Sequence, residues 1–294
     1  MNLENIHTLH VLFIPTGITA VIILLLRFFK HFRLIISPHY VDAKDVQSLP
    51  LRKLYSLTNQ IIVQSRRSYD ILKPINGNIT IIPPFMDLFS SDMPPFERKF
   101  QTKKELGIPG DFTVIFPGEY QLIQDIQQFC EMVEITLQKD AHISFVIACR
   151  LKNNSDFRIK KSIQDRLKKH SNIFFIDTTP IFEKYLSVSD VCIFPAKHMQ
   201  YKFDLPLAII EAIGYEMPII VSDISPLNEI YQNQKDGLLA KRYSDFPQMI
   251  LDLKRNEPFY QKQKSIAVSL KHFYSSLEIV HRHQTIYDQL NHHE

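Results

Sequence analysis

Glycine is scarce in this sequence, since only 7 of the 294 residues are glycine. None of the glycines forms the G-x-G-x-x-G or P-loop pattern, and no G-x-S-x-G motif occurs. Those motifs supply the tight backbone turns that cradle phosphate groups or that present a nucleophilic serine. The sequence therefore argues against dinucleotide dehydrogenases, P-loop NTPases and hydrolases with a nucleophile elbow.

Cysteine is rare as well, and its spacing suggests neither disulfides nor a metal site. Cys130, Cys149 and Cys192 lie far apart, and the last two fall inside apolar runs, as reduced thiols of a cytosolic core do. The terminal pair His292 and His293 is typical of a frayed tail rather than of a ligand set. We therefore expect a cytoplasmic protein that needs no metal.

A strong charge of one sign is also missing. The formal net charge is +3, and the lysines and arginines are scattered rather than clustered. Nothing in this pattern indicates a nucleic-acid partner. Apolar residues make up 45% of the chain, which is enough for the cores of one large or two ordinary domains.

The longest hydrophobic segment, Val11 to Phe29, is too short to be a membrane span. Its uninterrupted apolar part runs from Ala20 to Leu26, whereas a bilayer needs about 20 residues. Pro15, Thr16 and Gly17 are typical of a turn from a strand into a helix. We expect a buried strand and helix here. The alternative is peripheral contact with a membrane, because cations follow at Arg27, Lys30, His31 and Arg33.

Short β-rich runs alternate with helical segments along most of the chain. Such alternation predicts an α/β fold with parallel sheets and helices on both faces. The expected strands are Leu9 to Ile14, Arg33 to Ser37, Gln60 to Ser65, Ile79 to Pro84, Phe112 to Pro117, Ile143 to Arg150, Ile173 to Asp177, Asp190 to Pro195, Met217 to Asp223 and Gly237 to Ala240.

Composition divides the chain into three parts. Residues 87–109 are richer in proline, serine and charge, as a linker is. We therefore expect a partial Rossmann-like domain over residues 1–100 and a more complete one over 101–256. A helical tail over 257–294 is expected to pack back across both, with Ile266, Leu270, Phe273, Leu277, Val280 and Tyr287 near one face.

One helical segment contains an isolated carboxylate. The run LPLAIIEAI from Leu205 to Ile213 is apolar on every side except at Glu211. Helices of this kind are normally buried, and a buried carboxylate without partners is costly. Glu211 must therefore either meet hydrogen-bond donors as a structural residue or point into a cleft where a ligand supplies them.

Several motifs, in order, resemble the group 1 glycosyltransferases, called family 4, which are retaining enzymes of the two-domain GT-B fold. The segments that carry the resemblance are ITIIPPFMD (79–87), FPGEY (116–120), SDVCIFPA (189–196), KFDLPLAIIEAIGYEMPIIVSDISPLNEI (202–230) and DGLLA (236–240). The resemblance covers nearly the whole chain. It implies that the second domain binds a nucleotide-sugar donor, a UDP- or GDP-sugar, and that no other cofactor takes part.

The resemblance also implies roles for particular residues. Family members carry two glutamates separated by seven residues, and the second matches Glu211, whose expected partners are the ribose hydroxyls of the donor. The start of its helix, at Asp204, Leu205, Pro206 and Leu207, would face the pyrophosphate or the sugar.

The sequence departs from the family at three places. Phe203 occupies the position of the first glutamate, so the adjacent Asp204 is the candidate catalytic carboxylate, and Pro206 replaces a glycine. The loop at Gly118 and Glu119 lacks the usual Arg and Lys. A related branch of the family has a similar loop and a basic residue at the end of the next strand, which matches Arg150. The resemblance therefore makes Arg150, together with Lys202, the candidates for neutralising the pyrophosphate, with surface cations as the alternative for each.

The first domain supplies one further candidate and one puzzle. His39, in SPHY after a predicted strand, matches a family histidine that faces the donor, although a lone histidine also fits a packing or surface role. The first domain is shorter than the family's. The edge near Leu9 to Ile14 would therefore need cover from a partner chain, a second copy or a membrane.

The resemblance thus implies a cytoplasmic glycosyltransferase, hexosyltransferase-like, of glycan biosynthesis. It would move a sugar with retention from a nucleotide-diphosphate-sugar to a hydroxyl acceptor, either a glycan or a lipid-linked molecule. The alternative is a non-catalytic nucleotide-sugar-binding subunit, or a degenerate transferase that needs a partner chain.

Overall fold

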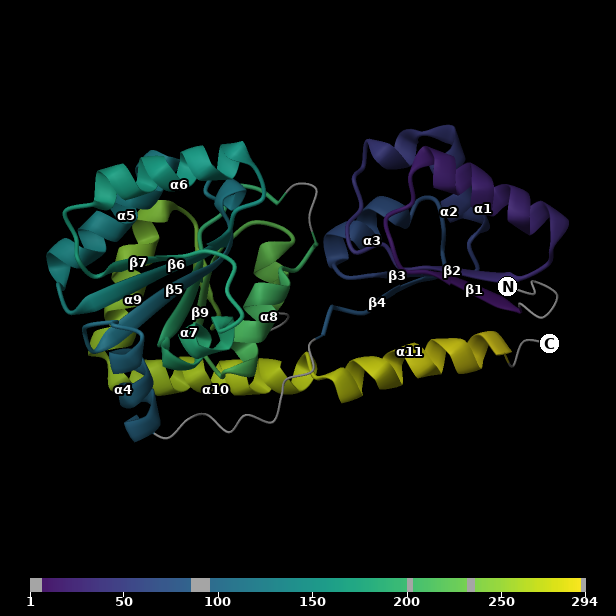
Figure 1. The fold of residues 1–294 in the computed structure, drawn as a ribbon. Helices are drawn as coiled ribbons and strands as arrows, with labels where there is room; N and C mark the ends of the chain where they lie inside the picture. The colour runs from purple at the N-terminus through teal and green to yellow at the C-terminus, as the bar shows by residue number, and fades with distance from the viewer. Residues whose placement is uncertain (1–6, 86–95, 200–202, 232–235, 292–294) are drawn as a thin grey trace. The chain divides into compact units, whose positions relative to one another are not determined.

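The computed structural model of the protein describes residues 7–85, 96–199, 203–231 and 236–291 (Figure 1). The chain divides into two compact units, and each has its own parallel sheet. The first unit comprises Met1–Phe85, Gln200–Leu205 and Ser276–Glu294, and the second comprises Met86–Met199 and Pro206–Ser275. The predicted α/β fold with two parallel sheets, the N-terminal one smaller, is confirmed. The assignment of residues 1–100, 101–256 and 257–294 as domains stays a prediction.

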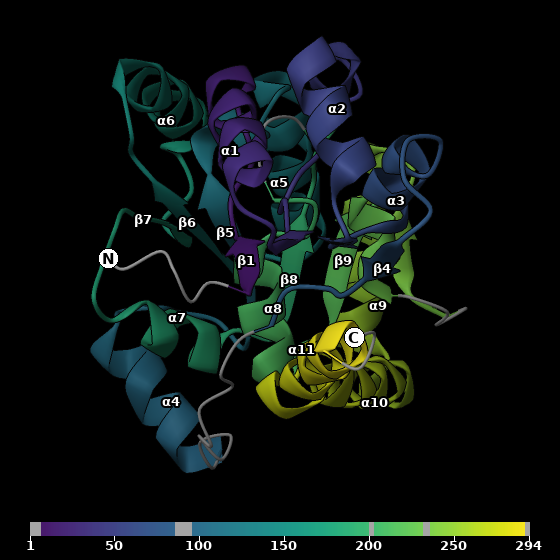
Figure 2. The same ribbon diagram turned by 90° about the vertical axis from the view of Figure 1, so that its right-hand side faces the viewer.

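The sheet of the first unit has four strands in the order β1-β2-β3-β4. These are β1 (Thr8–Val11), β2 (Arg33–Ile36), β3 (Gln60–Val63) and β4 (Ile79–Ile81). Because each strand is placed beside its predecessor in the same direction, right-handed crossovers put all three connecting helices on one face. These are α1 (Gly17–Phe29), α2 (Leu49–Leu57) and α3 (Arg66–Leu72), and Figure 2 shows them together on one side of the strands.

The other face of this sheet is covered by the end of the chain. Helix α11 (Ser276–Asn291) runs along the side of the strands opposite α1, α2 and α3 (Figure 2). Its Ile279 and Ile286 pack against Ile35, Ile62 and Ile82. Strand β1 remains at the edge of the sheet that the structure describes, where the sequence predicted an edge in need of cover.

Helix α1 forms where it was predicted, but it is not buried as the sequence analysis expected. Thr16 caps it, and the side chain of Thr19 completes a capping box. Only Ala20 and Ile23 of the helix are buried. The prediction of a buried helix is therefore wrong, because one side of the helix packs on the first unit while most of its apolar surface faces outward.

The sheet of the second unit has six strands in the order β10-β9-β8-β5-β6-β7. They are β5 (Phe112–Glu119), β6 (Ile143–Arg150), β7 (Ile173–Ile176), β8 (Val191–Phe194), β9 (Ile219–Ser222) and β10 (Leu238–Ala240). The chain adds strands outward from β5 in one direction and then from β8 in the other. The order therefore reverses between β5 and β8, as in doubly wound nucleotide-binding folds.

The helices of the second unit cover both faces of its sheet (Figure 1). One face carries α5 (Ile126–Lys139), α6 (Asn154–Leu167) and α9 (Phe246–Arg255), and the other carries α4 (Phe96–Glu105), α7 (Phe182–Val188), α8 (Leu207–Gly214) and α10 (Glu257–Phe273). The three cysteines are buried and free, as expected.

The helical tail is not one amphipathic helix. It breaks at Tyr274 and Ser275, so α10 belongs to the second unit and α11 to the first. The break changes the face that α11 buries. Leu277 and Val280, placed on the packed face by the sequence, are exposed, and Ile279 and Ile286 are buried instead.

Candidate functional site

The carboxyl ends of β5, β6 and β7 surround a cavity of about 320 Å³ in the second unit. Open α/β sheets bind ligands outside the carboxyl ends of their strands, beside the point where the strand order reverses. The cavity is lined by Gly118, Ala148, Cys149, Arg150, Asp177, Thr178, Thr179, Phe182, Leu207, Ala208 and Glu211. Four residues predicted for the donor site, Gly118, Arg150, Leu207 and Glu211, therefore lie around one cavity.

Gly118 allows the end of β5 to reach this position. Its φ angle of +151° lies in a region that residues with a side chain rarely adopt. A Cβ atom there would lie 3.3 Å from Cδ1 of Leu122. The strand then continues to Glu119, which pairs in register with Arg150 at the end of β6.

Glu211 projects from α8, a helix held in place by the buried side chains of Ile209, Ile210, Ala212 and Ile213. The carboxylate makes no hydrogen bond or ion pair with any described residue. Burial raises the pKa of Glu211, and the negative charge of Glu183 adds to the effect while Arg150 opposes it. The structure thus places a partly desolvated carboxylate at a cavity wall without giving it a donor.

The N-terminus of α8 lies at the same cavity. Leu207 and Ala208 form its first turn and line the cavity, and no side chain caps the helix at Pro206. The first amides of a helix lack partners within the helix, and the helix dipole favours an anion beside them. An anionic group in the cavity would therefore meet a favourable field.

Two cations at the end of β6 share one carboxylate. Nη2 of Arg150 lies 3.1 Å from Oε1 of Glu119, and Nζ of Lys152 contacts the same oxygen. Glu119 is buried, whereas the side chains of Arg150 and Lys152 are 62% and 44% exposed. Glu119 therefore acts as an anchor for two exposed cations, and of these Arg150 lines the cavity.

The sequence analysis did not identify Asp177, Thr178 and Thr179 as site residues. They follow β7 directly and line the cavity beside Arg150. Lys160 holds Asp177 through Nζ, at 2.7 Å from both carboxylate oxygens. The rule that ligands bind at strand ends, applied to IFFID and the two threonines after it, would have found them.

His39 and Asp204 belong to the first unit. The side chain of Asp204 is fully buried, and its Oδ2 accepts hydrogen bonds from the hydroxyls of Ser65 and Ser68, each at 2.6 Å. Nη1 of Arg67 lies 3.6 Å from its other carboxylate oxygen. Despite these partners, burial raises the pKa of Asp204. The carboxylate is thus held by residues of its own unit.

The same segment also packs on His39. The backbone N–H of Asp204 donates to the carbonyl oxygen of His39 at 2.9 Å, and the rings of Phe203 and His39 lie 4.7 Å apart. Burial lowers the pKa of His39. Leu205 is buried in the first unit, Pro206 begins the segment that returns to the second, and Lys202 lies outside the described residues.

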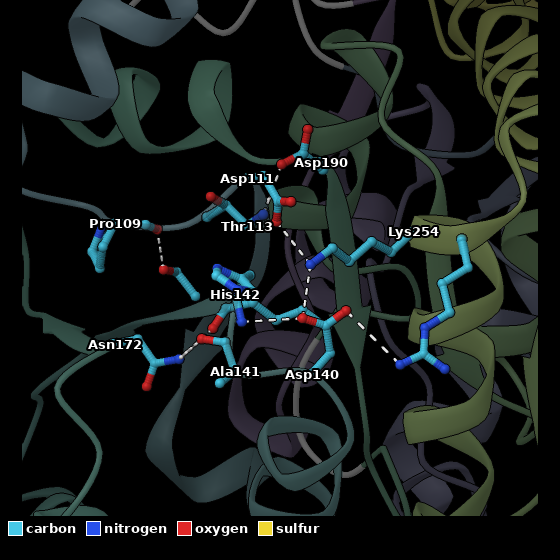
Figure 3. A network of polar contacts seen from close by, with 12 residues as sticks. Pro109, Asp111, Thr113, Asp140, Ala141, His142, Asn172, Asp190 and Lys254 are labelled. Carbon is cyan, nitrogen blue, oxygen red and sulfur yellow. Dashed lines mark hydrogen bonds and ion pairs between the residues drawn. The ribbon is translucent and has the colours of Figure 1, made fainter.

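At the amino-terminal ends of the strands of the second sheet, acidic and basic side chains form ion pairs (Figure 3). Nζ of Lys254 lies 2.7 Å from the carboxylate of Asp111 and 2.9 Å from that of Asp140 (Figure 3). Asp190 accepts from the backbone N–H of Thr113 at 2.7 Å, and Nζ of Lys99 lies 2.6 Å from it. The charged residues at the amino-terminal ends of the strands therefore stabilise the sheet. Glu211, which has no partner among the described residues, lies at the carboxyl-terminal ends.

Among the described residues, no helix is both long enough and apolar enough to cross a bilayer. No cluster of three or more histidine, cysteine, aspartate or glutamate side chains is placed to hold a metal ion in that part of the chain.

Residues 111–256 match the family model described as glycosyl transferases group 1. No curated protein sequence matches the chain.

Solved structures resemble the chain over almost its full length. HepE (Alr3699) of Anabaena in complex with UDP has a TM-score of 0.77 at 12% identity, over 95% of this chain and 78% of that one. Sucrose-phosphate synthase of Thermosynechococcus elongatus has a TM-score of 0.75 at 15% sequence identity, and the match covers 98% of this chain and 74% of that one. TarM of S. aureus has a TM-score of 0.62 at 18% sequence identity, and the match covers 88% of this chain and 51% of that one. The chain therefore has the GT-B glycosyltransferase fold, and its residues 111–256 match the group 1 glycosyltransferases.

Proposed function

We propose that this protein is a retaining glycosyltransferase that takes its sugar from a UDP-sugar bound in the cavity of the second unit. The observation that carries the proposal is the Glu211 carboxylate, which lines that cavity and makes no hydrogen bond or ion pair within the described residues. Support comes from the family match over residues 111–256 and from HepE, whose structures contain UDP and UDP-glucose.

Glu211 suits the ribose of a nucleotide. A carboxylate offers two acceptor oxygens to a pair of neighbouring hydroxyls, and partial burial strengthens such bonds. No described residue donates a hydrogen bond to this carboxylate, so the ribose hydroxyls would supply its donors.

Arg150 and the start of α8 suit the diphosphate. In sugar transfer the nucleoside diphosphate is the leaving group, and negative charge develops on it as the glycosidic bond breaks. Arg150, anchored by Glu119, and the dipole of α8 would stabilise that charge. Lys202 is proposed for the same role from the sequence alone.

The acceptor is a hydroxyl of a glycan or of a lipid-linked molecule, and the transferred group is a hexose. TarM was solved with α-GlcNAc-glycerol and UDP, and the pneumococcal transferase GtfA with UDP and GlcNAc. We propose a cytoplasmic site of action. The assignment of His39 and Asp204 as catalytic residues stays a prediction.

Thermal unfolding with and without nucleotides tests the donor site. UDP at about 1 mM is expected to raise the Tm of the wild-type protein by several degrees, because a ligand that binds only the folded state stabilises it. GDP and ADP serve as competing candidates. The Glu211→Gln variant is expected to lose the shift.

The matched control is Glu216→Gln, the same change on a glutamate just past the other end of α8, which pairs with Lys271. It should keep the full shift. If no nucleotide stabilises the wild-type protein, the proposal fails. Stabilisation without transfer from any UDP-sugar would instead identify a nucleotide-sugar-binding subunit.

A further inference from the structure

Helix α1 presents an apolar surface that the described structure leaves uncovered. Six side chains, which we call the α1 stripe, are between 44% and 80% exposed: Ile18, Val21, Ile22, Leu25, Phe28 and Phe29. At 100° per residue they fall within an arc of about 120° along the whole helix. A contiguous apolar patch of this kind marks an interaction surface.

The single charge of α1 does not interrupt the stripe. Arg27 is only partly exposed, and its Nη2 donates to Oδ1 of Asn59 at 2.9 Å, while Nη1 contacts the carbonyl oxygen of Leu57. The guanidinium therefore points to the end of α2, on the side of the helix that also buries Ala20 and Ile23. The exposed side carries no acidic and no basic residue.

The neighbourhood of the stripe is positively charged. Residues 12–57 contain six lysines and arginines against two aspartates, a formal net charge of +4. The whole chain carries +3, so the remaining residues together carry −1. Lys30 follows the stripe directly, and Arg52 and Lys53 are exposed on α2, which packs against α1.

We propose that the α1 stripe docks on an anionic lipid bilayer, with α1 lying in the plane of the interface. A helix of 13 residues is about 20 Å long, too short to span the hydrocarbon core but suited to lie along its surface. Large apolar side chains on one face with flanking lysines and arginines are the signature of interfacial helices. Nearby cations add attraction to acidic headgroups.

This inference goes beyond the proposed sugar transfer and does not depend on it. The cavity at Glu211 lies in the second unit, and the stripe lies in the first. Docking at the stripe would keep the enzyme at the surface where lipid-linked acceptors are found. A test with empty vesicles and no nucleotide separates the two proposals, because its failure leaves donor binding untouched.

Vesicle flotation of the full chain is the test. Wild-type protein is expected to float with vesicles of phosphatidylcholine containing about 30 mol% phosphatidylglycerol, and much less with phosphatidylcholine alone. Phe28→Ser/Phe29→Ser is expected to lower the bound fraction about tenfold or more, because two aromatic side chains lose their favourable transfer. Lys30→Gln/Lys53→Gln is expected to remove the preference for acidic vesicles.

The control is Phe100→Ser/Phe157→Ser, which changes two phenylalanines of the second unit that are 65% and 58% exposed. It should float like wild type. The substituted phenylalanines and Lys53 are exposed and Lys30 is partly exposed, and an unchanged circular dichroism spectrum checks that each variant folds. The proposal is overturned if wild-type protein stays at the bottom of the gradient with the acidic vesicles, or if the Phe28→Ser/Phe29→Ser variant floats with them as wild type does. It is also overturned if light scattering shows a dimer that this variant converts to monomers, since a second copy would then cover the stripe.

Discussion

Carboxylates at the two ends of the six-stranded sheet differ in whether they have partners. At the amino-terminal ends of the strands, Nζ of Lys254 lies within 4 Å of Asp111 and Asp140 (Figure 3). Nζ of Lys99 lies equally close to Asp190. At the carboxyl-terminal edge, Glu211 has no partner among the described residues and lines a cavity. Ion pairs therefore stabilise the sheet at the amino-terminal ends of its strands, whereas a carboxylate without a described partner lines the cavity at the carboxyl-terminal ends.

The pKa values follow the same division. Burial alone would raise the pKa of Asp140, but the hydrogen bonds from Lys254 and from the N–H of His142 outweigh it and hold the pKa below its usual value. Burial raises the pKa of Glu211, the charge of Glu183 adds to the effect, and no hydrogen bond from a described residue compensates. A perturbed carboxylate in a cavity marks a functional site, whereas a paired one marks a structural contact.

The largest expected effect is on stability, at the amino-terminal ends of the strands. Lys254→Met removes the cation shared by Asp111 and Asp140 and leaves Asp140, whose side chain is only 15% exposed, without its main partner. We expect a loss of about 3 kcal/mol in the free energy of unfolding, the cost of breaking a largely buried ion pair. Urea unfolding measures it. An unchanged midpoint would show that these ion pairs do not stabilise the sheet as described.

The next effect is on binding, at the carboxyl-terminal ends of the strands. Arg150→Met removes a cation that lines the cavity. It is expected to weaken UDP binding about 10- to 100-fold, the worth of a charge-assisted hydrogen bond. The affinity for uridine, which has no phosphate, should stay the same. Calorimetric titration of both ligands measures the ratio. Equal weakening of UDP and uridine would assign Arg150 a structural role instead.

The smallest effect is the pH dependence of stability. A carboxyl whose folded-state pKa is raised binds its proton more tightly when folded, so ionised Glu211 lowers stability as pH rises above its unfolded pKa near 4.5. Glu211→Gln should therefore raise the Tm of the apo protein by about 1–2 °C at pH 7 and by nothing at pH 4.

The contribution of Asp140 to stability changes with pH in the opposite direction to that of Glu211. Its lowered pKa contributes stability that is present above its unfolded pKa of 3.8 and is lost as pH falls through its folded-state pKa. The Tm of wild type minus that of Lys254→Met should thus rise from acid to neutral pH, whereas the Tm of wild type minus that of Glu211→Gln should fall over the same range. Parallel melting curves from pH 3 to 8 check both slopes, and two slopes of the same sign would contradict the comparison.

Local sequence patterns predicted most of the fold. Strand β6 lies where the apolar run Ile143–Arg150 placed it, and Glu211 was noticed because it is the one charge in an apolar helix. Each signal is contained in one short run of consecutive residues, so no tertiary information was needed to predict it.

Contacts between distant segments could not be predicted. Asp204 is held by Ser65 and Ser68, which precede it by 139 and 136 residues. The exposure of α1 was missed for a related reason, because a helix that is apolar all round is usually buried and the pattern does not show which side lacks a partner. The break at Tyr274 changed the face of α11 in the same way.

Titration of UDP into wild type, Glu211→Gln and Glu216→Gln by calorimetry tests the central claim most directly. We predict that wild type and Glu216→Gln bind with the same affinity, and that Glu211→Gln binds at least tenfold more weakly, because it loses a charged acceptor for the ribose hydroxyls. Equal affinity in all three proteins would contradict the account, since the Glu211 carboxylate would then have no part in donor binding.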